Sequence, residues 1–322
     1  MNLNLAAFLT RQKPLIEAAL NKHLPKSSVP GAERLNSALR YALFPGGRRW
    51  RPVFTLLGAS LTEQRESRST IDALAVACAV EFLHTSSLIL DDLPSMDNAD
   101  LRRGKDALHL VFGEDAAILA ALALLNQSYG LFADLGSCDA AQKLVREASF
   151  CIGSNGMIGG QAADLHRGAG VSGQLFMEGR NMKTTALTRL MMTGGAIAAN
   201  APDYEVSALA RFGECLGLAY QIYDDLLDTC NEATVSGKTA HQDLRLSRPS
   251  AIADLGIAAA AKLAHAVIEE GVAVLRRNFQ HRPALDTIVS AAEYLFRDLD
   301  KYACVTPSCD ETEDQEFQYQ TV

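Results

Sequence analysis

Apolar residues recur at helical spacing along nearly the whole chain. The pattern predicts helices over residues 3–20, 33–43, 71–90, 116–132, 174–199, 204–229, 257–278 and 284–302. Alanine and leucine dominate these segments, whereas β-branched runs with strict alternation are scarce. Several of the predicted helices are apolar on more than one face, which is typical of the centre of a large bundle. We therefore predict an all-α fold, organised as a single-domain large helical bundle.

The breaks between these helices carry turn-forming residues. They lie at residues 25–31, 45–47, 168–173 and 231–249. No Pro/Gly/Ser-rich linker divides the chain. We predict one helical domain over residues 1–304, followed by an acidic, polar tail over residues 305–322 that frays.

Composition and charge exclude several classes of protein. With 322 residues, 48% of them hydrophobic, the chain can bury a large core, which excludes disorder for most of its length. The formal net charge of −8 argues against a nucleic-acid binder. The seven cysteines are scattered without a CxxC pair and no secretory signal is evident, so we expect reduced thiols and a cytoplasmic protein. Residues 116–133 carry no charge, but Asn126, Gln127 and Ser128 interrupt them, which favours a core helix over an integral membrane segment.

Two groups of aspartates stand out against this apolar background. The first aspartate cluster is Asp91, Asp92 and Asp97, and the second is Asp224, Asp225 and Asp228. Acidic residues inside apolar helices are costly unless they are paired or bound to cations. Asp224 and Asp228 are spaced i, i+4 and project from one helical face, while Pro94 should loosen the helix and redirect Asp97. Two such clusters on facing helices predict a site for Mg²⁺ completed by substrate phosphates, although each cluster alone could be a solvated helix end.

Basic residues lie close to both clusters along the chain. Arg102 and Arg103 follow the first cluster, and the segment 46–52 (GGRRWRP) places three arginines behind a glycine pair. Lys183 and Thr184 lie in another helical stretch, and Lys238 and Arg248 follow the second cluster. Arginine presents planar, multiple donors suited to phosphate oxygens. An acidic protein with metal-binding carboxylates and such cations fits a diphosphate substrate.

These motifs, taken together, resemble those of the trans-isoprenyl diphosphate synthases, also called polyprenyl synthetases. Residues 84–97 and 101–105 resemble the family's first aspartate-rich motif in its seven-residue form, and residues 221–228 resemble the second. Residues 46–52 resemble the GGKRxRP element with arginine for lysine, and residues 111–115 and 156–161 also match family segments. Leu90, Leu122 and Arg248 depart from the usual pattern, but the metal and diphosphate residues remain, so we expect activity.

The resemblance implies an isoprenoid-synthase bundle around a central apolar cavity and a prenyltransferase reaction. An allylic diphosphate (dimethylallyl, geranyl or farnesyl) would ionise with the help of several Mg²⁺ ions. The double bond of isopentenyl diphosphate would attack the cation, and proton loss would give a longer trans product. The pocket should be apolar to keep water from the carbocation. A homodimer is also implied.

The same resemblance assigns roles by motif position. The metal ligands would be Asp91, Asp92, Asp97, Asp224 and Asp228. The allylic diphosphate would be bound by Arg102, Lys183, Thr184, Gln221, Lys238 and Arg248, with Thr184 also stabilising the cation or steering proton loss. Isopentenyl diphosphate would be bound by Arg48, Arg51, His84 and Arg103.

Product length should depend on the residues one turn before the first cluster. The residues five and four positions before Asp91 are Ser86 and Ser87, where farnesyl-forming members often carry an aromatic plug. Two small residues leave room, which predicts a product longer than fifteen carbons, most simply geranylgeranyl diphosphate with twenty. A farnesyl product stays an alternative, because a plug could come from Phe82, Met157 or a neighbouring helix.

Two other hypotheses remain open from the sequence. A terpene cyclase or head-to-head condensing enzyme shares the aspartate motifs, but cyclases typically carry an Asn/Ser/Glu motif in place of the second cluster. A non-catalytic regulatory subunit would be expected to lose metal carboxylates, and none is lost here.

Overall fold

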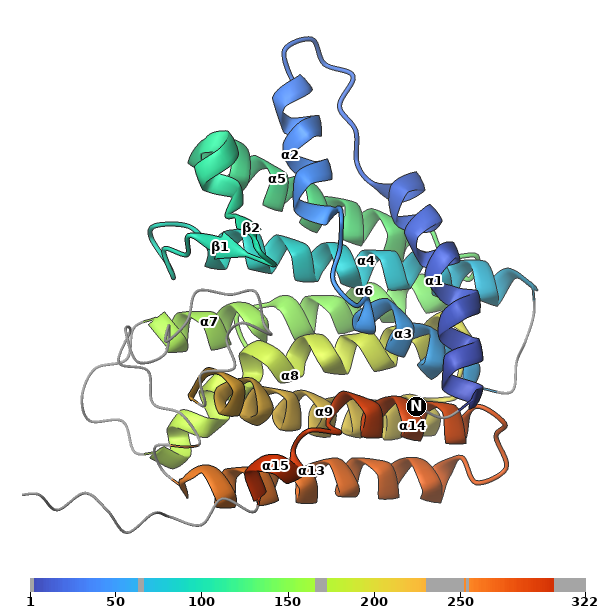
Figure 1. Cartoon of the computed structure of the whole chain (residues 1–322). Helices are drawn as coiled ribbons and strands as arrows, with labels where there is room; N and C mark the ends of the chain where they lie inside the picture. The colour runs from blue at the N-terminus through green and yellow to red at the C-terminus, as the bar shows by residue number, and fades with distance from the viewer. Residues whose placement is uncertain (1–2, 63–66, 166–172, 230–251, 253–254, 304–322) are drawn as a thin grey trace, which may run out of the picture.

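The computed structural model describes residues 3–62, 67–165, 173–229, 252 and 255–303, with side chains described outside 67–69 and 173–181. The described part of the chain is almost entirely helical, which confirms the predicted all-α class (Figure 1). Its elements are α1 (Leu3–His23), α2 (Glu33–Leu43), α3 (Trp50–Ser60), α4 (Ser67–Asp91), β1 (Leu101–Arg102), β2 (Lys105–Asp106), α5 (Leu108–Ala133), α6 (Cys138–Ile152), α7 (Met157–Leu165), α8 (Gly173–Ala198), α9 (Asp203–Thr229), α13 (Ile257–Asn278), α14 (Leu285–Leu295) and α15 (Asp300–Ala303).

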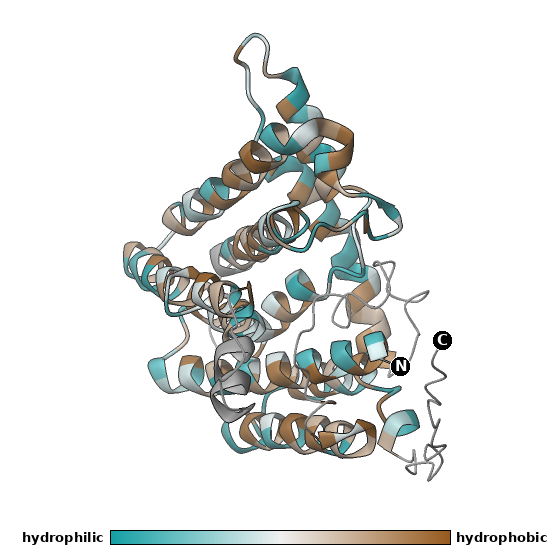
Figure 2. Ribbon diagram, turned by 90° about the vertical axis from the view of Figure 1, so that its left-hand side faces the viewer, coloured by the Kyte–Doolittle hydropathy of each residue, from teal (hydrophilic) through white to brown (hydrophobic). Residues whose placement is uncertain are grey.

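Helix α8 lies at the centre of the bundle. It packs against α3, α4, α6, α7 and α9, while α9 packs in turn against α13. Hydrophobic positions recur along these helices between polar ones (Figure 2), and their buried members form one continuous core. Because α8 touches both α4 and α9, it links the two helices that carry the aspartate clusters.

Glycines on α9 set its distance from α8. A Cβ atom at Gly213 would lie 2.6 Å from the carbonyl oxygen of Thr188, and one at Gly217 would lie 2.8 Å from Cα of Thr185. Neither position can therefore carry a larger residue without moving one helix. This close approach continues toward the C-terminal end of α9, where the second aspartate cluster lies.

The helix boundaries agree with the sequence prediction in most places, and the differences have physical reasons. The predicted single helix over 284–302 is two helices: α14 ends at Leu295 and α15 is a separate short helix. The chain turns between them, which places both Phe296 and Leu299 in the core. Helices α3, α6 and α7 and the two-stranded hairpin β1–β2, with Leu101 opposite Asp106, were not predicted. The predicted tail over 305–322 lies outside the described residues.

Two helices are long and apolar enough to cross a membrane, judged by length and composition alone. They are Thr70–Asp91 and Leu108–Ala133. The first is 72% buried within the protein, as a core helix is. Only 39% of the second is buried, because one face of α5 exposes Ile118, Leu119 and Leu122.

Candidate active site

The first aspartate cluster is assembled by a turn at the C-terminal end of α4. The backbone N–H of Asp97 donates to the carbonyl of Asp91 at 2.9 Å, and that of Asn98 donates to the carbonyl of Leu93 at 3.0 Å. Asn98 adopts the left-handed conformation (φ 46°) that such a reversal needs. Pro94 lies within the turn, where the sequence predicts that the helix loosens, and the turn brings the backbone of Asp97 beside that of Asp91.

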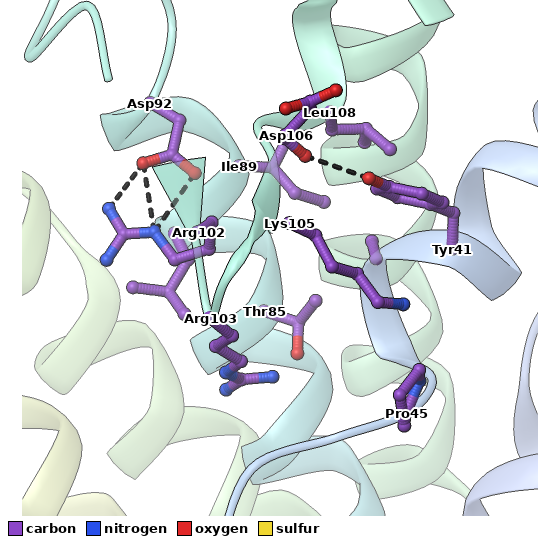
Figure 3. A pocket seen from close by; sticks show the side chains of 12 residues that line it. Tyr41, Pro45, Thr85, Ile89, Asp92, Arg102, Arg103, Lys105, Asp106 and Leu108 are labelled. Atoms are coloured by element: carbon purple, nitrogen blue, oxygen red, sulfur yellow. Dashed lines mark hydrogen bonds and ion pairs between the residues drawn. The ribbon is translucent and has the colours of Figure 1, made fainter. Parts of the chain in front are cut away.

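Two cations offset part of the negative charge of this cluster. Arg102, on β1, donates from Nε to both carboxylate oxygens of Asp92 at 3.0 and 3.1 Å and from Nη2 to Oδ1 (Figure 3). Lys183, on α8, places its Nζ 3.2 Å from Oδ2 of Asp91 and 3.8 Å from Oδ2 of Asp164 on α7. The structure therefore brings Arg102 and Lys183, both predicted to bind the allylic diphosphate, to the first cluster together with Asp164.

Burial controls the electrostatics of these carboxylates. Asp91, Asp92 and Asp97 are all buried. Burial raises the pKa of Asp91, and the charge of Asp97 raises it further, against the opposing effect of Lys183. Burial likewise raises the pKa of Asp92, although Arg102 opposes it. Negative charge is concentrated here beyond what two side-chain cations offset, so an additional cation would be bound favourably.

The second aspartate cluster meets α8 at the residue after Lys183. Thr184 donates from Oγ1 to Oε1 of Gln221 at 2.7 Å, and Gln221 donates from Nε2 to Oδ1 of Asp225 at 3.0 Å. Asp225 is buried, while Asp224 and Asp228 are half-buried on α9. Consecutive residues of α8 thus lead to the two clusters: Lys183 contacts the first directly, and Thr184 reaches the second through Gln221.

A third group of side chains surrounds His84 on α4. The Nη1 atom of Arg51 lies 2.9 Å from Nε2 of His84, and the Nη2 atom of Arg103 lies 3.4 Å from the same nitrogen. Guanidinium nitrogens only donate, so Nε2 must accept and His84 is neutral, with its proton on Nδ1. Burial lowers the pKa of Arg103, as do the charges of Arg49 and Arg51. Such a cluster of cations favours an anion. Arg48, by contrast, is exposed on the preceding loop.

A small cavity lies beside this group, between α2, α4 and the β-hairpin (Figure 3). Arg103 and Lys105 line it, together with Thr85 on α4 and Tyr41 on α2. The buried hydroxyl of Thr85 has no hydrogen-bond partner among the described residues. The cavity shares Asp92, Arg102 and Arg103 with the groups above, and therefore belongs to the same site.

The two serines before the first cluster differ in their surroundings. Ser86 is buried against α5 and donates from Oγ to the carbonyl of Ala121 at 2.9 Å. Ser87 is half-buried and donates to the carbonyl of His84 at 2.9 Å. Leu122 is half exposed on the outer face of α5. The predicted central apolar cavity stays a prediction, because the side chains of 166–181 are not described.

The donor chemistry of the site suits Mg²⁺, which prefers oxygen ligands. Among the described residues, no three His, Cys, Asp or Glu side chains are arranged so that they could hold a metal ion by themselves. Magnesium is commonly bound by one or two carboxylates, with the remaining positions filled by substrate phosphates and water. The aspartates therefore suit magnesium ions whose remaining positions are filled by phosphate and water oxygens.

Some candidate residues cannot be placed, and others were missed. Lys238 and Arg248 lie outside the described residues. Sequence reasoning did not single out Asp164. This residue lies three positions beyond Gln161, the last residue of the matched segment 156–161. It also treated Arg49 only as one of the three arginines of segment 46–52. In the structure its guanidinium is buried in ion pairs with Glu17 and Glu81.

Comparison with known proteins places the chain in a family. The family model for polyprenyl synthetase matches residues 32–290. The chain is 37% identical over 249 residues to heterodimeric geranylgeranyl pyrophosphate synthase large subunit 1, chloroplastic, of Arabidopsis thaliana, covering 74% of this chain and 65% of that protein. It is 37% identical over 248 residues to farnesyl diphosphate synthase of Bacillus subtilis (strain 168), covering 76% of this chain and 82% of the relative. The chain thus spans slightly less than two thirds of the plant relative.

A solved structure agrees over nearly the whole length. The geranyltransferase of Helicobacter pylori, complexed with magnesium and isoprenyl diphosphate, superimposes with a TM-score of 0.79 at 29% identity. The match covers 92% of this chain and 99% of that one. Since the family model spans most of the sequence and the fold agrees with a solved relative, the chain belongs to the polyprenyl synthetase family.

Proposed function

We propose that the chain is a magnesium-dependent trans-prenyltransferase that joins isopentenyl diphosphate to an allylic diphosphate, with geranylgeranyl diphosphate as the product. The observation that carries this proposal is that consecutive α8 residues are linked to the two clusters, the first directly and the second through Gln221. Lys183 Nζ lies 3.2 Å from Asp91, and Thr184 Oγ1 donates to Gln221, which donates to Asp225. A diphosphate at this point would be within reach of carboxylate-bound ions and of fixed cations.

The chain's own residues would stabilise the leaving diphosphate. Negative charge develops on it as the allylic C–O bond breaks, and Lys183 and Arg102 are fixed donors beside that position. Asp91, Asp92, Asp97, Asp224 and Asp228 would hold the magnesium ions, which, when bound, would supply further positive charge. Both cations are now engaged with aspartates. We expect them to turn partly toward the substrate when metal ions take over their carboxylate partners.

The cationic group around His84 would hold the second substrate. Arg51 and Arg103 share the Nε2 atom of His84 and retain further N–H donors for a diphosphate. In this arrangement His84 orients the two arginines from a neutral ring. Arg48 would add a donor from the loop. Isopentenyl diphosphate would then lie beside α4, close to the first aspartate cluster.

Small residues at positions 86 and 87 support a product of twenty carbons. Neither serine places bulk one turn before Asp91. Among relatives of 33–40% identity, proteins named geranylgeranyl diphosphate (or pyrophosphate) synthase predominate over the farnesyl diphosphate synthase. A farnesyl diphosphate synthase is the second candidate, favoured by the Bacillus subtilis relative.

The test is to incubate the purified chain with Mg²⁺, isopentenyl diphosphate and, separately, dimethylallyl, geranyl and farnesyl diphosphate. Chromatography of the dephosphorylated products should show a twenty-carbon alcohol from all three primers and no turnover in EDTA. Products that stop at fifteen carbons, with farnesyl diphosphate left unused, would favour the second candidate. No condensation product with any primer would favour a non-catalytic subunit, and cyclised hydrocarbons would favour a cyclase.

The exposed face of α5 supports a homodimer as part of this proposal. Ile118, Leu119 and Leu122 lie within one turn and expose 40%, 54% and 51% of their surface. A cluster of large apolar residues on one exposed face marks an interaction surface. A second copy of the chain would cover it. Light scattering should give twice the chain mass, and Leu119→Asp should give the single mass; a monomeric wild-type protein would contradict this assembly.

A further inference from the structure

Arg49 is held by four hydrogen bonds that engage all three nitrogens of its guanidinium group. Nε donates to Oε1 of Glu17 at 2.7 Å, and Nη1 donates to Oε1 of Glu81 at 2.7 Å. Nη2 donates to the carbonyl of Leu43 at 2.8 Å and to Oε2 of Glu17 at 3.3 Å. The residue is only 4% exposed. Arg49 is therefore not available to a substrate, unlike the other two arginines of the GGRRWRP segment.

These bonds join three helices to the loop before α3. Glu17 belongs to α1, Leu43 is the last residue of α2, and Glu81 lies on α4 three positions before His84. Arg49 itself is the N-cap of α3 and adopts a left-handed conformation (φ 56°, ψ 34°). The start of α3 is thus fixed relative to the turn of α4 that carries His84.

The loop backbone is shaped around this guanidinium. A Cβ atom at Gly46 would collide with the guanidinium carbon and nitrogens of Arg49. A Cβ atom at Gly47 would meet the guanidinium of Arg103 at ordinary contact distances, the shortest being 3.5 Å to Nε. Lys105 also holds the start of this loop, because its Nζ donates to the carbonyl of Phe44 at 3.2 Å. Of the glycine pair, Gly46 is the one that Arg49 requires.

Charge explains why an arginine can be buried here. Burial alone would lower the pKa of Arg49, but its hydrogen bonds and charge interactions with Glu17 and Glu81 raise it, so the group stays ionised. The charge of Glu81 also opposes the lowering of the pKa of Arg103. Glu81 therefore offsets part of the repulsion among the arginines around His84.

We infer that Arg49 is a positioning residue for isopentenyl diphosphate: through Glu17 and Glu81 it fixes the loop that carries Arg48 and holds Arg51 beside His84 and Arg103, without touching the substrate. The inference rests on the proposed function, since it assigns that substrate to the cationic group. The hydrogen bonds of Arg49 do not involve Lys183, Thr184 or the second aspartate cluster in any described contact. Its loss should therefore affect one substrate and not the other.

The experiment compares Arg49→Met with wild type by calorimetric titration of isopentenyl diphosphate and of a non-reactive farnesyl thiolodiphosphate with Mg²⁺. We expect affinity for isopentenyl diphosphate to fall about tenfold or more, while affinity for the farnesyl analogue stays within about twofold. Arg49→Lys keeps the positive charge but loses the planar guanidinium with its several donors, and should give an intermediate loss of affinity for isopentenyl diphosphate. Glu17→Gln, at a half-exposed partner, should fold normally and show a smaller loss with the same selectivity.

Arg282→Met is the matched control. Arg282 donates to the buried carboxylate of Glu205 at 2.8 Å, near the start of α9 and about 24 Å along that helix from Gln221. This variant should lose thermal stability without changing either affinity. Equal weakening of both ligands in Arg49→Met, or unchanged binding of isopentenyl diphosphate in both Arg49→Met and Glu17→Gln, would overturn the inference.

A readout without ligand separates this inference from the proposed function. Arg48 is exposed, so release of the loop in Glu17→Gln, which leaves the Arg48–Arg49 bond unchanged, should speed tryptic cleavage after Arg48 relative to wild type and to Arg282→Met. If wild type bound no isopentenyl diphosphate, the proposed function would fail, and the positioning of Arg48 would still be decided by cleavage. An unchanged cleavage rate would contradict the positioning role.

Discussion

Replacing Lys183 with methionine tests the electrostatic account of the first aspartate cluster. Methionine keeps much of the aliphatic stem of Lys183 but removes the charge 3.2 Å from Asp91 Oδ2 and 3.8 Å from Asp164 Oδ2. Their side chains are only 12% and 5% exposed, so both would lose a cation in a poorly solvated place. Breaking a buried ion pair typically costs about 3–5 kcal/mol. Because Lys183 is itself 24% exposed, we expect a loss of about 1–3 kcal/mol in the free energy of unfolding.

The assay is urea unfolding at pH 7.5 and pH 5 without Mg²⁺. Burial and the charge of Asp97 already raise the pKa of Asp91, and removing Lys183 removes a group that lowers it. The folded variant would therefore bind a proton more readily than the unfolded chain, and its stability deficit should shrink as the pH falls. Adding Asp91→Asn to the variant should recover part of the loss.

Lys143→Met is the matched control for this perturbation. Lys143 also contacts two aspartates, with Nζ 3.2 Å from Asp139 and 3.4 Å from Asp203, but all three side chains are largely exposed. Exposed pairs contribute about 0–1 kcal/mol, so this variant should unfold almost like wild type. Equal stability losses for Lys143→Met and Lys183→Met, or a Lys183→Met deficit that grows at pH 5, would refute the reasoning.

Three further predictions concern catalysis, product length and thiol reactivity. Asp91→Asn and Asp224→Asn should each abolish turnover while circular dichroism stays unchanged, and a variant of undiminished rate would contradict the metal-binding role. Ser86→Phe should shorten the product as judged by chromatography, at a stability cost of about 1–3 kcal/mol because Ser86 is buried against α5; an unchanged product would place the chain-length limit elsewhere. Iodoacetamide at pH 8 should modify exposed Cys138, whereas burial raises the pKa of Cys78 to about 12 and should protect it until urea is added, as peptide mass spectrometry can show.

The sequence predicted most of the helices because their apolar periodicity is strong. It did not predict α3, where every residue from Pro52 to Gly58 is buried and no polar face marks the helix. It also missed α6, although Ser137 caps that helix by accepting from the N–H of Ala140, and its buried positions recur at helical spacing. In α6 the signal was present, whereas α3 is specified by the bundle that surrounds it.

The candidate site shows the same division. Local motifs were enough to single out Asp91, Asp97 and Lys183, and the turn at Pro94 followed from the proline itself. The pairing of Arg49 with Glu81 could not be predicted, because the two residues are 32 positions apart and meet only when α3 packs on α4. Glu81 lies in an apolar helix, which signals a buried partner, but the sequence does not indicate which cation it is.

The most direct test of the central claim is a crystal structure with Mn²⁺ in place of Mg²⁺ and farnesyl thiolodiphosphate bound. We predict anomalous peaks at about 2.0–2.3 Å from carboxylate oxygens of both aspartate clusters, with the diphosphate between them and Lys183 in contact with it. Peaks at one cluster only, or a diphosphate bound away from α8 with no metal beside it, would contradict the account.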